Sequence, residues 1–416
     1  MKGQNKLFFA IVWALILGLI AGAIVHFYFP EHIEGFSSKI KLLGTIFIRM
    51  VQMIIAPLVF TTLVVGIAKM SDVSMIGRVG AKAMLWFIVA SLVSLLIGLF
   101  FVNWLEPGHV VNLDLNDTSG ADDLISHTKA FSLEDFVKHV VPKSLFEAFA
   151  TNEVLQIVVF SVMFGIALAN LGKKYSKPMV KLLDVAAHAI LKMVGYIMWV
   201  APAGVFGAIA AIVASKGFSI FTVYAVYLRD FLIALAVLWL ILLIVGYFIL
   251  GNRLMELLRR IKEPLLIAFS TTSSEAVFPK LLEELERFGC NNKIVSFILP
   301  LGYSFNLDGS MMYMTFASIF IAQIYGIEMA LGEQIVMLLV LMLTSKGIAG
   351  VPRASLVIIV ATCAMFGIPP EGVALILPID HFCDMGRSMT NVLGNSLATC
   401  AVAKWEGELD RHGGEL

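Results

Sequence analysis

Long apolar stretches alternate with shorter polar segments along the first 250 residues of the chain. A membrane-crossing helix needs about 20 mainly apolar residues, because the hydrocarbon core of a bilayer is about 30 Å thick. The first stretch lacks a small-residue cleavage site and is longer than a signal-peptide core, so we expect it to be retained as a span. In total we predict six spans here, at about 7–29, 44–68, 83–105, 153–171, 180–213 and 220–250.

Basic residues fall in every second loop, which indicates the orientation of these spans. Lysine and arginine are enriched in cytoplasmic loops, and the acidic loop at 105–142 would then lie outside. We expect both termini in the cytoplasm and a location in the cell (cytoplasmic or inner) membrane. The basic residues are Lys2, Lys6, Lys69, Arg78, Lys82, Lys173, Lys174, Lys177, Arg253, Arg259, Arg260 and Lys262.

The pattern changes after Pro264, where apolar stretches are interrupted near their centres. The segments 268–279 and 344–355 place small, polar or charged residues where the middle of the bilayer would lie. Irregular backbone is tolerated at that depth only where protein or a cavity satisfies it, so we predict two re-entrant hairpins. The turn chemistry of 306–309 predicts that the apolar stretch at about 294–327 unwinds midway. Interrupted segments of this kind point to a substrate and ion site.

A polar stripe follows in the last apolar segment. Asp380, Asp384, Arg387, Asn391 and Asn395 are spaced by four, three, four and four residues. That spacing places all five on one face of a helix. Charged groups at membrane depth are costly and usually face a partner or a water-filled site, so the stripe is a candidate functional site. Two structural alternatives stay open: Asp384 and Arg387 could pair only to hold the helix, and Asp380 could neutralise Arg387 or serve packing alone.

Composition agrees with a polytopic membrane protein. Of all residues, 59% are hydrophobic and 14% are charged, against roughly 25% charged in a soluble domain. Thirty basic residues balance 30 acidic ones, so the charge does not indicate a nucleic-acid partner. The four cysteines are scattered without metal-type spacing and are interpreted as apolar fillers. The sequence lacks His-Glu-x-x-His and Gly-x-Ser-x-Gly motifs, which argues against an enzyme.

Four motifs, in this order, resemble the dicarboxylate/amino acid:cation symporters, the glutamate transporter family, in its bacterial proton/sodium-glutamate form. They are a Ser-Ser hairpin tip, Asn-x-Asp-Gly-Ser, Gly-Ile-Ala-Gly-Val-Pro and Asp-Met-Gly-Arg-Ser-x-x-Asn. The resemblance extends to the N-terminal half, for example from Ile55 to Gly66. It implies an all-α membrane protein with eight transmembrane helices, two re-entrant hairpins, a homotrimer and an elevator mechanism. Residues 1–251 would be mainly scaffold, with spans 3 and 6 moving with a transport core at 252–416.

The resemblance also implies a substrate site. Arg387 matches the arginine that holds the substrate's side-chain carboxylate, for which a planar guanidinium is well suited. Asp384 matches the aspartate that takes the α-ammonium group, so it favours glutamate or aspartate over the alternative, a C4-dicarboxylate such as succinate, malate or fumarate. The α-carboxylate would meet short hydroxyls and peptide N–H groups. The other implied contacts are Ser273, Ser274, Ser310, Gly350, Val351, Ser388 and Asn391.

Departures from the sodium-driven pattern of this family favour protons as at least part of the coupling. The aspartate expected one turn beyond Asn391 is Asn395 here, which removes a charge from one implied sodium site. At a second site, Ala90 replaces the expected threonine beside Ser91. Co-transported H⁺ or Na⁺ takes the place of a cofactor, and sodium remains possible at Asn306 and Asp308. The implied cation ligands are Ser91, Gly302, Ser304, Asn306, Asp308, Ser345, Lys346, Ile348, Asn391 and Asn395.

Proton coupling requires a protonatable group. Glu275 at the first hairpin tip, Asp308 and Asp384 are the candidates, although Glu275 could instead cap the helix that follows it. Arg353 stands where the family often has glycine. It could bind a carboxylate, replace a cation or extend to the outside face.

Other functions stay open beside this interpretation. A cystine or neutral amino acid carrier fits poorly, because Arg387 is present. An anion channel or a receptor is conceivable, but a dedicated channel would not need the pair of Asp384 and Arg387, which matches a substrate with both charges.

Overall fold

The regular secondary structure in the described parts of the chain is helical, with no strand, which confirms the all-α prediction. The structure is a computed structural model that describes residues 2–68, 73–110, 141–171, 173–217, 224–345 and 354–409. The longer helices are α1 (Lys2–Tyr28), α2 (Ile33–Ala68), α3 (Val73–Leu105), α8 (Val154–Asn170), α9 (Lys173–Met198), α10 (Ala201–Lys216), α12 (Ala225–Leu250), α13 (Arg253–Thr271), α14 (Phe278–Phe288), α15 (Asn292–Phe305), α16 (Asp308–Ile324), α17 (Leu331–Thr344), α18 (Ala354–Met365) and α19 (Leu377–Trp405). Short helical segments are η1 (Pro30–His32), α4 (Pro107–Val110), α7 (Leu145–Thr151), η2 (Glu275–Val277) and η3 (Pro370–Leu375).

The described residues include four helices that are long and apolar enough to cross a membrane, or five if one bent pair counts as a single span. The bent pair is α9 with α10, which meet at 49° where we predicted one continuous span at 180–213. Pro202 lies in the first turn of α10, and proline in that position favours a helix start over a continuous helix. The second and third spans also differ from prediction, because α2 and α3 begin well before residues 44 and 83.

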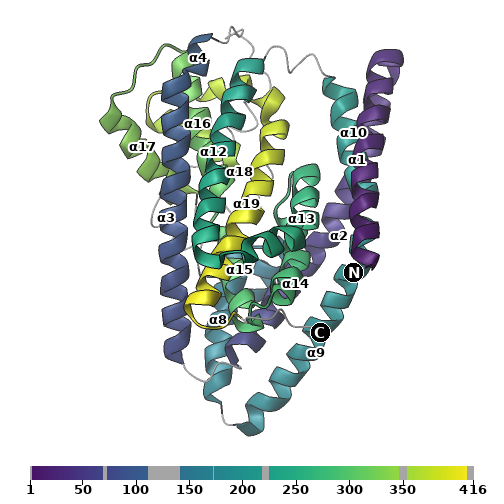
Figure 1. Cartoon of the computed structure of the whole chain (residues 1–416), viewed down its shortest axis with the longest axis vertical. Coiled ribbons are helices and arrows are strands. Elements are labelled where there is room, and N and C mark those ends of the chain that lie inside the picture. Colours follow the sequence, from purple (N-terminus) through teal and green to yellow (C-terminus); the bar gives the residue numbers. More distant parts are fainter. Residues whose placement is uncertain are drawn as a thin grey trace.

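The helices pack in two groups that lie side by side (Figure 1). One group consists of α1, α2, α8, α9 and α10, in which α2 contacts α8, α9 and α10. The other consists of α3, α12, α13, α15, α16 and α19, with α19 packed against each of the others. Helix α15 also contacts α2 and so joins the groups. That one group is a fixed scaffold and the other a moving core stays a prediction.

Two of the three predicted interruptions fall on described residues, and both are present. Helices α13 and α14 form a helix-turn-helix through η2, and Thr272 ends α13 in the left-handed conformation. We call α13, η2 and α14 hairpin 1. Helix α15 ends at Phe305 and α16 begins at Asp308, which confirms the unwinding at 306–309. The second predicted tip, between α17 and α18, lies largely outside the described residues.

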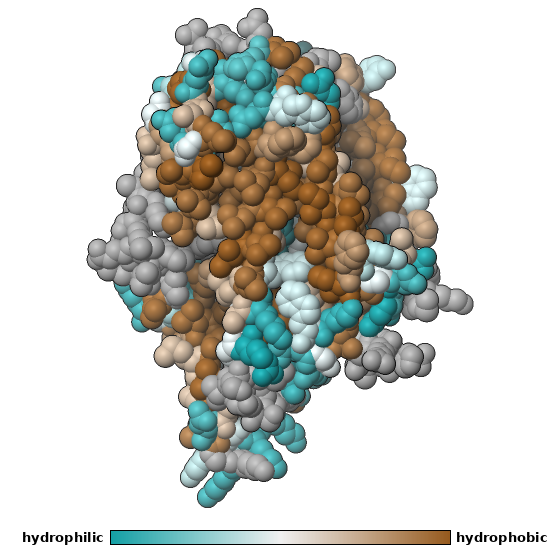
Figure 2. Space-filling model, turned by 60° about the vertical axis from the view of Figure 1, so that its left-hand side comes forward, coloured by the Kyte–Doolittle hydropathy of each residue, from teal (hydrophilic) through white to brown (hydrophobic). Residues whose placement is uncertain are grey.

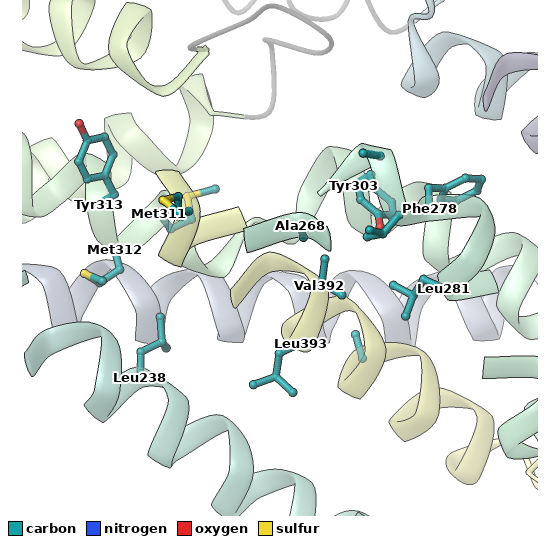
Figure 3. Packing of buried hydrophobic residues seen from close by; sticks show 14 of the residues in the cluster. Leu238, Ala268, Phe278, Leu281, Tyr303, Met311, Met312, Tyr313, Val392 and Leu393 are labelled. Carbon is teal, nitrogen blue, oxygen red and sulfur yellow. The ribbon is translucent and has the colours of Figure 1, made fainter. Parts of the chain in front are cut away.

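The face shown in Figure 2 carries a broad apolar region between two more polar ends. Large apolar side chains such as Phe100 and Phe248 are 60% and 81% exposed, as expected for helices that face lipid. Most buried side chains are apolar as well. In Figure 3, Phe278 of hairpin 1 lies beside Tyr303 of α15, and their ring centroids are 5.3 Å apart. Hairpin 1 is therefore anchored on α15, directly before the break that precedes Asp308.

Candidate functional site

The predicted polar stripe lies on one uninterrupted helix, α19. Four of its members are nearly completely buried: Asp380 (2% exposed), Arg387 (3%), Asn391 (3%) and Asn395 (1%). The fifth, Asp384, has a side chain that is 20% exposed. The stripe faces α16 and the α15–α16 break and forms two polar centres, one around Arg387 and one around Asp308.

The arginine centre consists of Arg387, Asp380, Asp384 and Tyr313. Arg387 Nε donates to Asp384 Oδ1 at 2.7 Å, and Arg387 Nη2 lies 3.6 Å from Asp380 Oδ1. The hydroxyl of Tyr313 donates to Asp380 at 2.9 Å, while the guanidinium carbon lies 4.5 Å from the centroid of the same ring. A cation over a tyrosine ring is attracted by the ring quadrupole. Arg387 is thus held in place by two carboxylates and one aromatic face.

This geometry bears on the expected roles of both aspartates. Asp384 forms the ion pair that the packing alternative required, and it also accepts from Ser388 Oγ at 3.1 Å. Asp380 contacts Arg387, as expected if it neutralises that charge. Arg387 Nη1 is buried and has no hydrogen-bond partner among the described residues. Since an unpaired buried donor is costly, this nitrogen is suited to a carboxylate brought by a ligand.

The amide centre consists of Asn306, Asp308, Asn391, Asn395 and Ser94. Asn306 Nδ2 donates to Asp308 Oδ2 at 3.1 Å and to Asn395 Oδ1 at 3.2 Å. Asn391 Oδ1 accepts from the backbone of Gly309 (2.9 Å) and its Nδ2 donates to Ser310 Oγ at 3.1 Å. The side chains of α19 therefore bind the unwound turn and the first residues of α16. This arrangement brings Ser310, an expected substrate contact, next to four expected cation ligands, Asn306, Asp308, Asn391 and Asn395.

Glycines allow the helices to approach closely enough for these contacts. A Cβ on Gly394 would collide with Asp308 Oδ2, and one on Gly302 would collide with Asn395 Oδ1. Gly302 was expected as a carbonyl ligand of a cation. The structure gives a reason for a glycine at this position, because its missing side chain makes room for Asn395.

The amide centre is rich in oxygen, which suits a hard cation such as sodium. Asn306 Oδ1 is buried without a hydrogen-bond partner in the described parts of the chain, and so is Asn395 Nδ2. The only carboxylate among the five members is that of Asp308. Within the described residues there is no cluster of three or more His, Cys, Asp or Glu side chains that could hold a metal ion. Any cation in the amide centre would bind through neutral oxygen atoms and the single carboxylate of Asp308.

Ser94 is a member of this centre that the sequence argument missed. Its hydroxyl lies 3.3 Å from Asp308 Oδ1, and Ser91 Oγ lies 3.5 Å from the carbonyl of Phe305. Both serines are fully buried on α3. Ser94, one helical turn after Ala90, therefore supplies the hydroxyl that Ala90 lacks. The sequence contained this information, because Ser94 follows Ser91 by three residues and so lies on the same helix face.

The tip of hairpin 1 places its candidates next to α2. Ser273 Oγ accepts from the backbone of Ala276 at 3.2 Å, and Ser274 precedes η2. Glu275 lines a small cavity of about 10 Å³ with Ile55, Val59, Phe278 and Tyr303. The surroundings of Glu275 are thus mainly apolar, and its role as a proton carrier stays a prediction.

The remaining predicted residues fall into two sets. Ser345 is buried and its hydroxyl bonds to the carbonyl of Met342, while Ser304 is half-buried at the end of α15. Their role in a third cation site stays a prediction. Five residues near the second hairpin tip lie outside the described residues: Lys346, Ile348, Gly350, Val351 and Arg353.

The chain is similar to known transport proteins along nearly its whole length. Residues 7–405 match the model of the sodium:dicarboxylate symporter family. The chain is 42% identical to the C4-dicarboxylate transport protein of Laribacter hongkongensis, over 98% of this chain and 92% of that protein. It is 39% identical to the C4-dicarboxylate transport protein of Bacillus subtilis, over 97% and 96% of the two chains.

A relative with another name is nearly as similar. The proton/sodium-glutamate symport protein of Bacillus caldotenax is 38% identical, over 97% of this chain and 96% of that protein. Both names describe carriers of dicarboxylic acids. The family match covers α1 through α19, including both polar centres. The chain therefore belongs to the sodium:dicarboxylate symporter family.

Proposed function

We propose that the protein is a secondary symporter that carries four-carbon dicarboxylates across the cell membrane together with protons, or with protons and sodium. The observation that carries the proposal is Arg387, a buried guanidinium with one nitrogen available for a carboxylate. Most of the relatives named above and others of similar identity are C4-dicarboxylate transport proteins. These names outweigh the preference for amino acids that the sequence argument drew from Asp384.

The charges around the site explain why transport should need a cation. Asp380 and Asp384 outnumber Arg387, so the arginine centre carries one negative charge in excess, and Asp308 adds another nearby on α16. A dicarboxylate dianion would add two more negative charges where water is scarce. Like charges repel strongly in such surroundings. Protonation of a carboxylate, or a cation in the amide centre, would offset this repulsion and couple the two fluxes.

In this mechanism one substrate carboxylate binds Arg387 at Nη1, the nitrogen that has no hydrogen-bond partner among the described residues. The guanidinium can hold a carboxylate through two parallel hydrogen bonds, and Ser310 and the hairpin serines provide short hydroxyls for the other end. The hairpins would cover the bound substrate, and the second group of helices would slide against the first as an elevator within a homotrimer.

An acidic amino acid is the second candidate substrate, and Asp384 favours it. Its side chain is one-fifth exposed, the most accessible carboxylate of the stripe. A carboxylate in that place can accept hydrogen bonds from an α-ammonium group, which succinate lacks. Aspartate has the four-carbon skeleton of succinate, so one site could accept both.

Uptake into proteoliposomes tests the proposal. Labelled succinate, aspartate and glutamate would be offered with a proton gradient or a sodium gradient imposed separately. We expect succinate uptake driven by the proton gradient, with or without a contribution from sodium. Failure of every dicarboxylate to accumulate under either gradient would refute the proposal.

The variant Asp384→Ser distinguishes the two substrate classes. If Asp384 receives an ammonium group, aspartate uptake should fall by about tenfold or more, because a charge-assisted hydrogen bond contributes roughly 1.5–3 kcal/mol. Succinate uptake should persist, because the uncharged hydroxyl of the variant cannot repel a second carboxylate. Equal losses for succinate and aspartate would mean that Asp384 acts only by holding Arg387.

A further inference from the structure

A second polar site lies away from both centres, in a groove of about 250 Å³ between the two groups of helices. One wall is apolar and consists of Leu7 of α1, Val194 and Met198 of α9, and Trp199 in the turn that follows α9. The other wall is charged and belongs to hairpin 1. Gly195 lies between the apolar residues and leaves the groove open, since a Cβ there would meet no atom within 4 Å.

The charged wall contains one carboxylate that is not satisfied. Glu263 of α13 is only 5% exposed, and its Oε1 has no hydrogen-bond partner among the described residues. Its neighbours on α14 are better paired. Lys280 lies 3.1 Å from Glu284 and 3.4 Å from Glu283, and Arg287 contacts the same two glutamates.

The charges that line the groove are balanced, so its unpaired atom selects the occupant. Two carboxylates, Glu263 and Glu283, and two basic groups, Lys280 and Arg287, line the groove. Both basic groups contact the glutamates of α14, which leaves Glu263 Oε1 as an acceptor without a partner among the described residues. A buried acceptor without a partner is costly, and a cationic group with N–H donors would relieve that cost. Arg287 is 43% exposed at the same wall and keeps N–H donors for a phosphate.

The apolar wall indicates that the occupant also has a hydrocarbon part. Tyr196 of α9 and Trp199 in the turn after it are 64% and 63% exposed, and tryptophan and tyrosine are typical of the level of lipid headgroups. Leu7, Val194 and Met198 complete the apolar wall. The groove therefore combines an acyl-compatible wall with a site for a cation and a phosphate.

We propose that this groove binds a membrane phospholipid with a primary-ammonium headgroup, phosphatidylethanolamine. The ammonium group donates to Glu263 Oε1, the phosphate faces Arg287, and the acyl chains follow the wall of α1 and α9. Phosphatidylcholine carries no N–H donor on its nitrogen, and phosphatidylglycerol carries no positive charge. The proposal does not depend on which substrate is transported.

Lipid binding to the purified protein tests this, with native mass spectrometry after titration with one phospholipid at a time. We expect retained phosphatidylethanolamine to exceed phosphatidylcholine and phosphatidylglycerol of the same chain length. Equal retention of all three would overturn the proposal. Glycerophosphoethanolamine, which has no acyl chains, should bind at least about tenfold more weakly, because each buried CH₂ contributes to lipid binding. Equal binding of this headgroup would show that the groove holds a soluble amine.

Two variants test the location of the site. The elution profile of each purified variant is compared with that of the wild type to check that the variant is folded. Glu263→Gln removes the charge and should weaken phosphatidylethanolamine binding by about tenfold, since hydrogen bonds to charged groups contribute more than neutral ones. Gly195→Leu fills the groove and leaves all charges in place. Glu256→Gln is the matched control, because Glu256 lies on the same helix, 42% exposed, and pairs with Arg260. Unchanged binding in Gly195→Leu would place the lipid elsewhere and refute the proposal.

Discussion

The two polar centres on α19 differ in how their charges are balanced. In the arginine centre a positive charge is held between Asp380, Asp384 and the ring of Tyr313. In the amide centre a negative charge, that of Asp308, is held by a serine hydroxyl and an asparagine amide. One centre therefore offers strong donors to an anion, and the other offers oxygens to a cation.

The difference also shows in which atoms lack partners. In the described chain, the arginine centre leaves a donor nitrogen unpaired on Arg387, whereas the amide centre leaves an acceptor oxygen unpaired on Asn306. The unpaired donor of Arg387 could bond to an anion, and the unpaired acceptor oxygen of Asn306 could bind a cation. Asn391 connects the centres, because it follows Arg387 by one turn and binds the first residues of α16. Binding of an anion at one centre and of a cation at the other would thus involve the same helix.

We expect the largest decrease in substrate uptake from Arg387→Ala. Loss of the guanidinium removes the only basic group of the arginine centre, and two carboxylates would then repel a dicarboxylate. Removing one partner of a buried charge pair typically costs about 2–5 kcal/mol in binding, so uptake should fall by about thirtyfold or more. Initial rates of succinate and aspartate uptake in proteoliposomes measure this.

The matched control for this variant is Arg260→Ala. Arg260 lies on α13 and pairs with Glu256 near the surface, so its removal should leave uptake close to that of wild type. Retained uptake in Arg387→Ala, in protein that elutes normally, would separate the arginine centre from substrate binding.

We expect a smaller effect from Asn395→Asp, which should strengthen sodium binding and not weaken transport. Asn395 Nδ2 is buried without a partner in the described chain, and its Oδ1 only accepts a hydrogen bond. The substitution therefore loses no hydrogen bond and adds a second carboxylate near Asp308. Two nearby negative charges attract a cation more strongly than one, so the sodium concentration for half-maximal uptake should fall by about tenfold.

Uptake measured over a sodium series at constant pH checks this prediction. Asn252→Asp is the control. Asn252 is exposed directly before α13, so this substitution makes the same chemical change at the surface. Uptake by Asn395→Asp that remains indifferent to sodium would mean that the amide centre binds no sodium.

The parts of the site that were predicted are those fixed by local chemistry. The spacing of Asp380 to Asn395 predicted the stripe on α19, and the turn chemistry of 306–309 predicted the break before Asp308. In both cases the information lies within a few residues of the feature. The bend between α9 and α10 was not predicted, although Pro202 in the first turn of α10 is local information of the same kind.

The parts that were missed depend on how helices cross. The contact of Ser94 with Asp308 joins residues 214 positions apart. The placement of Tyr313 over Arg387 likewise depends on the packing of α16 against α19. A single sequence indicates which residues share one face of a helix. It does not indicate the axial position at which two packed helices contact each other. The groove beside hairpin 1 could not be predicted for the same reason.

The smallest effect is expected at the end of α19, outside the polar centres. Glu406 binds Arg78 and Lys82 of α3, at 2.8 and 2.6 Å, and these contacts, chiefly the hydrogen bond from Arg78, lower the pKa of its carboxyl below the ordinary value of 4.5. A lowered pKa stabilises the folded state at neutral pH, and this contribution is lost as the pH falls through the lowered value. The basic partners are 56% and 32% exposed, so solvent screening limits the contribution to less than about 1 kcal/mol. Glu406→Gln should therefore lower Tm slightly at neutral pH.

The pH dependence distinguishes this ion pair from simple packing. As the pH falls below 4.5, the Tm of the wild type should approach that of Glu406→Gln, because protonation removes the charge that the substitution also removes. Glu147→Gln, at an exposed glutamate of α7, should follow the wild type throughout. A Tm difference that stays constant down to the acid range would mean that Glu406 joins α19 to α3 through its shape and neutral hydrogen bonds. In that case charge would matter to this protein at its two buried centres and not where α19 ends.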